Sequence, residues 1–146
     1  MAGPFDLERF VQAQDPVMEQ VRQELREGRK RSHWMWFVFP QLSGLGQSAM
    51  ARRYAIASLD EAKAYLKHPI LGPRLRDCSD LVNRVEGRSI DLIFGSPDDL
   101  KFHSCMTLFS LADPAVPVFK DALARYFGGV PDRLTTAKLA MRGAAP

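Results

Sequence analysis

Signals that begin α-helices recur throughout the chain, and they constrain its fold more than any other feature. Ser58 and Glu61 have the spacing of a capping box, in which each side chain bonds the backbone of the other residue. Ser96 is followed by a proline and two acids, which is typical of a cap and of the positive end of a helix dipole. Asp15 followed by Pro16 has a similar form, and Asp132 can cap a last helix.

Apolar residues between these signals recur at intervals of three or four, the spacing of one helix face. Glycines at 28, 87 and 128 are placed to end helices. No stretch alternates polar and apolar residues for long enough to predict an amphipathic strand. We predict an all-α single domain of six to eight helices over residues 1–142, with a frayed tail over residues 143–146. The expected core is Met18, Val21, Leu25, Tyr65, Leu66, Leu75, Phe102, Met106, Phe109, Leu123 and Phe127.

Composition excludes several classes of protein. With 146 residues, 46% hydrophobic and 25% charged, the chain is typical of one globular domain and not of a disordered protein. No apolar stretch approaches the length of a membrane span, and the N-terminus lacks the pattern of a signal peptide. The two cysteines, Cys78 and Cys105, lie in apolar helical patterns, so we expect buried reduced thiols and a cytoplasmic location.

The segment over residues 28–46, GRKRSHWMWFVFPQLSGLG, departs from the helical pattern. Three basic residues precede His33, and both tryptophans of the chain, Trp34 and Trp36, follow it. Aromatic residues favour extended backbone, and Pro40 prevents helix beyond them. We therefore predict a core segment that is either extended or a short helix.

This segment also combines the groups that a ligand site needs: flat apolar rings, an imidazole, an amide and nearby cations. Our leading hypothesis is a pocket for a nucleotide-like or ADP-ribose-like, phosphate-bearing small molecule, with its hydrolysis left open. Glycine and proline should place Gln41 to Gly46 in a loop at the edge of the core. The candidate ligand-binding residues are His33, Trp34, Trp36 and Gln41 on the side of the ring, with Arg52, Tyr54 and Lys101 as polar and cationic groups.

Catalytic candidates are His33, Asp98 and Lys101, because an imidazole, a carboxylate and an amine can each transfer protons. We expect His33 to have a polar partner and not to point freely into solvent. Asp98 has the alternative role of a helix-start residue. The three histidines have no spacing of metal ligands, and no nucleotide-binding, zinc-protease or hydrolase motif occurs. We predict no metal and no cofactor, and whether the chain is an enzyme stays open.

Three alternatives to the pocket stay open. The aromatic residues could simply pack in the core, or they could form a partner patch of a protein-interaction module without chemistry. The pocket is favoured if Trp34 and Trp36 line a concavity, and the interaction module is favoured if they lie on a flat exposed face. Binding of nucleic acid is a further alternative, but a net charge of +3 and few clustered cations argue against it. The residues it would use are Arg29, Lys30, Arg31, Arg52 and Arg53.

Several motifs resemble an uncharacterised bacterial family, the domain of unknown function numbered 1810. They include SHWMWFVFPQLSGLG from Ser32, FGSPDDLK from Phe94 and SCMTLF from Ser104, and the similarity extends from about Leu7 to Leu139. The resemblance implies a small, mainly α-helical fold and no established activity. Members are often labelled calpastatin, but calpastatins are disordered inhibitors and this composition is globular.

A second similarity is to NADAR proteins, which are small α-helical N-glycosidases of ADP-ribose-related molecules. It rests on the aromatic segment, on a helix with Arg52 and Tyr54, and on the MTLF sequence from Met106. This resemblance implies an N-glycosidase. The glutamate-bearing motif of those enzymes has no match here, so the activity does not follow from the fold alone.

Overall fold

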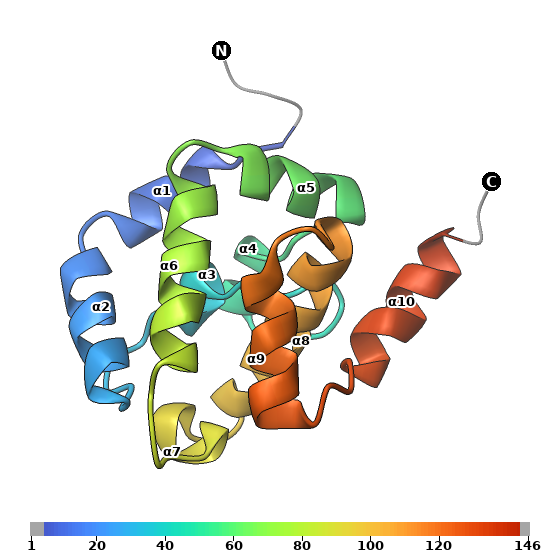
Figure 1. Ribbon diagram of the computed structural model, residues 1–146. Helices are drawn as coiled ribbons and strands as arrows, with labels where there is room; N and C mark the ends of the chain where they lie inside the picture. The colour runs from blue at the N-terminus through green and yellow to red at the C-terminus, as the bar shows by residue number, and fades with distance from the viewer. Residues whose placement is uncertain (1–4, 144–146) are drawn as a thin grey trace.

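The computed structural model describes residues 5–143, which form ten helices and no β-strand (Figure 1). The all-α, single-domain prediction is confirmed. The helices are α1 (Glu8–Gln14), α2 (Met18–Glu27), α3 (Met35–Val38), α4 (Ala49–Arg53), α5 (Leu59–Lys67), α6 (Leu71–Asn83), α7 (Ile90–Phe94), α8 (Asp98–Ala112), α9 (Pro117–Phe127) and α10 (Arg133–Gly143).

The described residues hold more helices than the six to eight that we predicted. The additional helices are α3, α4 and α7, which have four or five residues each. One turn is too short to show an i, i+3, i+7 pattern, and a helix of this length is not stable in isolation. These helices therefore depend on the tertiary structure around them.

Helix α8 is the centre of the fold, and it packs against α5, α7, α9 and α10. Its sequence is apolar on nearly every side, and Phe102, Cys105, Met106 and Phe109 have no exposed surface. A helix that is hydrophobic all round belongs in the interior. In Figure 1, α9 lies in front of α8, α6 runs from top to bottom between α2 and α9, and α7 lies at the lower end.

The predicted core is confirmed with one adjustment. Ten of its members are buried in one cluster, whereas Phe127 is partly exposed and packs against the edge of that cluster. Phe127 is the last residue of α9, and Gly128 then takes a left-handed conformation with φ of 62°.

The capping predictions have mixed outcomes. Ser58 accepts a hydrogen bond from the Glu61 backbone N–H at 3.1 Å, as predicted, while the Glu61 carboxylate accepts from the Ala57 N–H at 2.6 Å. Asp15 is not the N-cap of α2, where Val17 stands, because it keeps helical backbone angles (φ −51°, ψ −48°) at the end of α1 and an N-cap side chain acts from an extended residue. Its carboxylate instead binds Arg74 at 2.7 Å. Ser96 is not a cap either, since Pro97 is the residue before α8.

The aromatic segment resolves into a short helix, α3, and residues 41–46 form a loop, as predicted. An isolated bridge between Leu42 and Ile56 holds that loop to the chain that follows α4. Both bridge residues are buried, at 1% and 0% exposure. The loop is therefore anchored to the core by its second residue.

Helix α10 is tied to the rest of the fold by polar contacts at both ends. Asp132 caps it as predicted, since its carboxylate accepts from the Thr135 N–H at 3.1 Å and also from the Ser104 hydroxyl of α8 at 3.2 Å. Near its other end, Arg142 donates to the carbonyl oxygens of Ala57 and Ser43. The helix includes Gly143, the first residue of the expected tail, and residues 144–146 lie outside the described part.

None of the helices within residues 5–143 has the length and apolar character needed to cross a membrane.

Candidate functional site

The geometry of the candidate site begins where α2 ends. Gly28 has a φ of 71°, and the chain turns back after it, with the Arg29 N–H bonded to the Glu24 carbonyl oxygen at 3.0 Å. The Lys30 N–H then donates to the carbonyl oxygen of Ile93 in α7 at 2.8 Å. Glycine is favoured at this position because a left-handed residue with a side chain is strained. The turn therefore places Lys30 against α7.

Glu24 organises this turn from inside the fold. It has no exposed surface, and one carboxylate oxygen accepts from the N–H groups of Arg31 and Ser32 at 2.8 and 3.1 Å and from Trp34 Nε1 at 3.0 Å. The other oxygen accepts from the Ser32 hydroxyl at 2.6 Å and the Gln20 amide at 3.0 Å.

Burial by itself raises the pKa of the Glu24 carboxyl. The hydrogen bonds from Ser32, Arg31, Gln20 and Trp34 outweigh burial and lower that pKa from 4.5 to about 2. Glu24 is consequently ionised at neutral pH. Most of the hydrogen bonds to its carboxylate come from residues 31–34, which follow the turn at Gly28.

Trp34 is part of the core, with 1% of its surface exposed. Its ring packs against Phe39 and Phe94 at centroid distances of 6.2 and 6.4 Å, and Glu24 binds its N–H. The ring therefore has no open face for a ligand, contrary to the expectation that it faces one. Trp36, two residues later and in α3, is only half buried.

Two lysine side chains contact the same carboxylate, that of Asp98, beside these tryptophans. Lys30 Nζ lies 2.8 Å from Asp98 Oδ2, and Lys101 Nζ lies 3.6 Å from Asp98 Oδ1. Lys30 Nζ is also 5.2 Å from the centroid of the Trp34 ring, and Lys101 Nζ is 5.5 Å from that of Trp36. We call Lys30, Trp36, Asp98 and Lys101 the lysine–aspartate cluster.

The cluster is partly shielded from water. Its charged side chains are between 9% and 23% exposed, with Lys30 the most buried of them. Charges interact more strongly in such a place than on an open surface. Two positive groups share one negative group there, so the cluster has an excess of positive charge.

The other predicted site residues lie elsewhere. His33 is exposed and its ring makes no hydrogen bond with residues 5–143, so the prediction of a polar partner is wrong. The hydrogen bonds to Glu24 are made by Ser32 and Trp34 on either side of it, and the imidazole between them is left facing solvent.

Tyr54 is buried and packs against Phe10 and Phe37 at 5.8 and 5.3 Å between ring centroids.

Gln41 and Arg52 belong to the neighbourhood of α4. The Gln41 carbonyl oxygen accepts from the Ile56 N–H, and its side-chain oxygen lies near Gly46. Arg52 is exposed. In the described part of the chain, no hydrogen bond, ion pair or aromatic contact joins Gln41, Arg52 or Tyr54 to Lys101 or Trp36. The predicted site is thus divided, and only Trp36, Asp98 and Lys101 come together.

The basic run after α2 does not form one cationic surface. Lys30 turns toward Asp98, whereas Arg31 forms an ion pair with Glu27 on α2. Arg29 is exposed. A nucleic-acid footprint requires cations gathered on one face, and these side chains are divided between different partners.

The cysteines offer no nucleophile. Cys78 and Cys105 are free and buried, as predicted. Burial raises the pKa of the Cys78 thiol to about 12 and that of Cys105 well above its ordinary value. A thiol acts as a nucleophile only as its thiolate, so both groups are structural at neutral pH. No group of three or more potential metal ligands was found within residues 5–143.

Comparison with known proteins places the chain in a family. The profile of a family described as "Protein of unknown function (DUF1810)" matches residues 4–139. The chain belongs to this family. The crystal structure of the conserved hypothetical protein Rv1873 from Mycobacterium tuberculosis is 62% identical in sequence, with a TM-score of 0.93. The alignment covers 94% of this chain and 99% of that one. No curated protein matches the sequence.

These matches confirm the resemblance to the DUF1810 family and its helical fold. Neither description names an activity, a ligand or a partner, and neither mentions calpastatin or an N-glycosidase.

Sequence reasoning missed two residues of the site. Glu24 occupies a position between Val21 and Leu25 on the inner face of α2, and a carboxylate on an apolar face is a signal of a buried polar centre. Lys30 was interpreted only as part of a basic run. Nothing local in the sequence distinguishes it from Arg29 and Arg31, because its partner Asp98 comes from the start of α8.

Proposed function

We propose that this chain binds a phosphate-bearing small molecule with a planar ring at the lysine–aspartate cluster. The observation that carries the proposal is the convergence of two ammonium groups on the single carboxylate of Asp98, next to the half-buried ring of Trp36. Hydrogen bonds between ionised groups are the strong ones in recognition, and phosphate supplies several acceptors at once.

The excess positive charge favours an anion. Asp98 can neutralise only one of Lys30 and Lys101, and Lys101 Nζ lies at the longer distance of 3.6 Å. A phosphate oxygen that approaches Lys101 would provide the second negative charge without displacing the shorter contact between Lys30 and Asp98. Lys101 is therefore the cation that we assign to the ligand.

The ring of the ligand would be held by Trp36. Its indole is half buried on the short helix α3, and Lys101 Nζ lies near one face of it. Aromatic rings stack in offset or edge-to-face arrangements, so the exposed part of Trp36 can contact a base or a similar ring. Trp34 contributes indirectly, since its anchoring by Glu24 sets the position of α3.

The proposal is limited to binding. Among the catalytic candidates, Asp98 and Lys101 contact each other, whereas His33 forms no hydrogen bond with either. The N-glycosidase activity implied by the NADAR similarity would require a further acid or base that this geometry does not assign.

A second candidate is a protein-interaction surface at the same place. Leu92 on α7 and Leu100 on α8 are 55% and 60% exposed, and these two helices are in contact. Leu100 directly precedes Lys101 in the sequence, and an exposed leucine with a lysine fits a partner that has an acidic side chain next to an apolar one. A protein partner and a small ligand would both contact Lys101. Only the protein partner would also need Leu92 and Leu100.

Calorimetry with ADP-ribose, ADP, adenosine and inorganic phosphate tests the proposal. We expect ADP-ribose and ADP to bind, and Lys101→Gln to weaken them about 10-fold or more, because it removes a hydrogen bond between charged groups. Trp36→Leu should weaken ADP and leave phosphate unchanged.

Lys120→Gln is the matched control, since Lys120 is an exposed lysine on α9. It should bind like the wild type. If none of the ligands binds to the folded protein at millimolar concentration, or if Lys101→Gln binds as well as the wild type, the proposal is rejected. Leu92→Ser and Leu100→Ser should leave ADP binding unchanged.

A further inference from the structure

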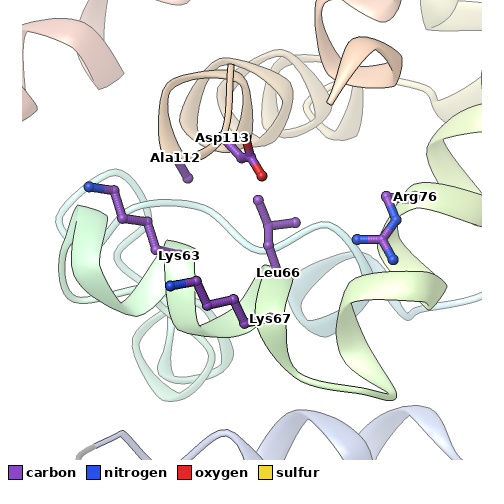
Figure 2. A pocket seen from close by; sticks show the side chains of 6 residues that line it. All are labelled: Lys63, Leu66, Lys67, Arg76, Ala112 and Asp113. Carbon is purple, nitrogen blue, oxygen red and sulfur yellow. The ribbon is translucent and has the colours of Figure 1, made fainter. Parts of the chain in front are cut away.

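A second candidate site is a pocket between α5, α6 and the C-terminal end of α8, away from the lysine–aspartate cluster. It has a volume of about 270 Å³. Its lining residues are Lys63, Leu66, Lys67, Arg76, Ala112 and Asp113 (Figure 2). This volume is at the small end of the range for ligand pockets, so a ligand of few atoms is required.

The pocket has more positive than negative charge. Lys63 and Lys67 are one turn apart on the same face of α5, and like charges at this spacing repel each other. Arg76 of α6 is half buried. None of these three cations takes part in an ion pair with a carboxylate in the described part of the chain. An anion between them would offset their repulsion.

Asp113 provides the opposite charge on another side of the pocket. It directly follows Ala112, the last residue of α8, where the carbonyl groups of a 15-residue helix leave a partial negative charge. Figure 2 shows Asp113 pointing from α8 toward Leu66, with the two lysines on one side and Arg76 on the other. Its carboxylate accepts from the Ala115 N–H at 3.1 Å.

The arrangement keeps opposite charges apart. Asp113 lines the same pocket as three cations, yet it lies within ion-pair distance of none of them. Leu66 and Ala112 lie among these charges and are each 7% exposed, so they form an apolar floor. A ligand with both kinds of charge and a short apolar chain would contact all three parts.

From this geometry we infer that the pocket binds a small dicarboxylate that also has an amine, the chemical class of the acidic amino acids. One carboxylate would bind Arg76, whose planar guanidinium pairs with carboxylates through two hydrogen bonds. The other carboxylate would lie between Lys63 and Lys67. The ammonium group would bind Asp113, and the methylene groups would contact Leu66 and Ala112.

Calorimetry with L-glutamate, L-aspartate, glutarate, succinate and inorganic phosphate tests this inference. We expect at least one of the two amino acids to bind more tightly than the matching dicarboxylate without an amine. Arg76→Gln should weaken every dicarboxylate about 10-fold or more, since it removes a bidentate charged contact. Asp113→Asn should weaken only the amino acids and leave glutarate and succinate unchanged or tighter.

Lys120→Gln serves as the control here too, and circular dichroism verifies that each variant is folded. Absence of binding to the folded wild type at millimolar ligand would overturn the inference. So would equal binding of succinate and aspartate together with an unaffected Asp113→Asn variant. Binding of phosphate that Arg76→Gln weakens, in preference to every dicarboxylate, would also overturn it, whereas phosphate bound at the lysine–aspartate cluster would not respond to this substitution. None of these variants touches Lys30 or Lys101, so failure here is distinct from failure of the proposed function.

Discussion

Glu24→Ala is expected to lower the free energy of unfolding by about 3–5 kcal/mol, because it leaves several buried donors without an acceptor. The N–H groups of Arg31 and Ser32 and the indole N–H of Trp34 all converge on one oxygen of this carboxylate. Urea unfolding followed by tryptophan fluorescence measures the change. Glu24→Gln should lose less than Glu24→Ala, because an amide oxygen can still accept from the same three groups.

The matched control is Glu27→Ala, one turn along the same helix. The Glu27 carboxylate is exposed and pairs with Arg31 at the surface, where ion pairs contribute little. Its loss should change the midpoint of unfolding only slightly. Equal destabilisation by the two alanine variants would contradict the role assigned to Glu24.

The same carboxylate makes the stability depend on pH. The pKa of Glu24 is lowered from 4.5 to about 2 in the folded state, so the unfolded chain binds the proton more tightly. Its contribution, about 3 kcal/mol, is complete above pH 4.5 and is lost as the pH falls toward 2. Unfolding measured across that interval should show a steeper loss of stability for the wild type than for Glu24→Gln. If the stability of the two proteins fell equally with pH, a group other than Glu24 would be responsible for the loss.

Phe102→Ala is the second large effect, with an expected loss of about 3–5 kcal/mol from the free energy of unfolding. Phe102 has no exposed surface and lies at the centre of an aromatic group. Its ring centroid is 5.1 Å from that of Phe39, 5.0 Å from Phe94 and 6.3 Å from Phe127. Removing the ring takes contacts from the residue after α3 and from α7 and α9 together, and the resulting cavity can close only in part.

Leu100→Ala, two residues earlier on α8, is the control for this substitution. Leu100 is 60% exposed, so its change should stay within about 0.5 kcal/mol. Thermal unfolding gives both values, and the Phe102 variant should melt about 10 °C below the wild type. A Phe102→Ala protein as stable as Leu100→Ala would mean that the aromatic group is not a shared core.

Much of the helical framework could be predicted because its signals are local. The Ser58 cap, the left-handed residues at Gly28 and Gly128, and the cap at Asp132 each act within a few residues of their helix end. Asp15 shows the limit of this reasoning. It has the composition of an N-cap, but its backbone stays helical at the end of α1 and its carboxylate pairs with the distant Arg74.

The candidate site could be predicted only in part, because its contacts join distant parts of the chain. Trp36, Asp98 and Lys101 were each identified as candidates, and the fold brings them together. His33 and Trp34 are adjacent in sequence, yet one is exposed and the other is buried. Which of two neighbours faces inward in a non-periodic segment depends on the surfaces that pack against it.

The amino-acid sequence by itself determined that this chain is helical and which helix faces are buried, because periodicity and capping depend on residues a turn or less apart. Only the tertiary structure decided that the Glu24 carboxylate accepts hydrogen bonds from the residues after Gly28 and that Lys30 forms an ion pair with Asp98. It also decided that the end of α8 places Asp113 opposite three cations. Each of these depends on helices from different parts of the chain packing at one place, and the sequence of no single helix encodes that.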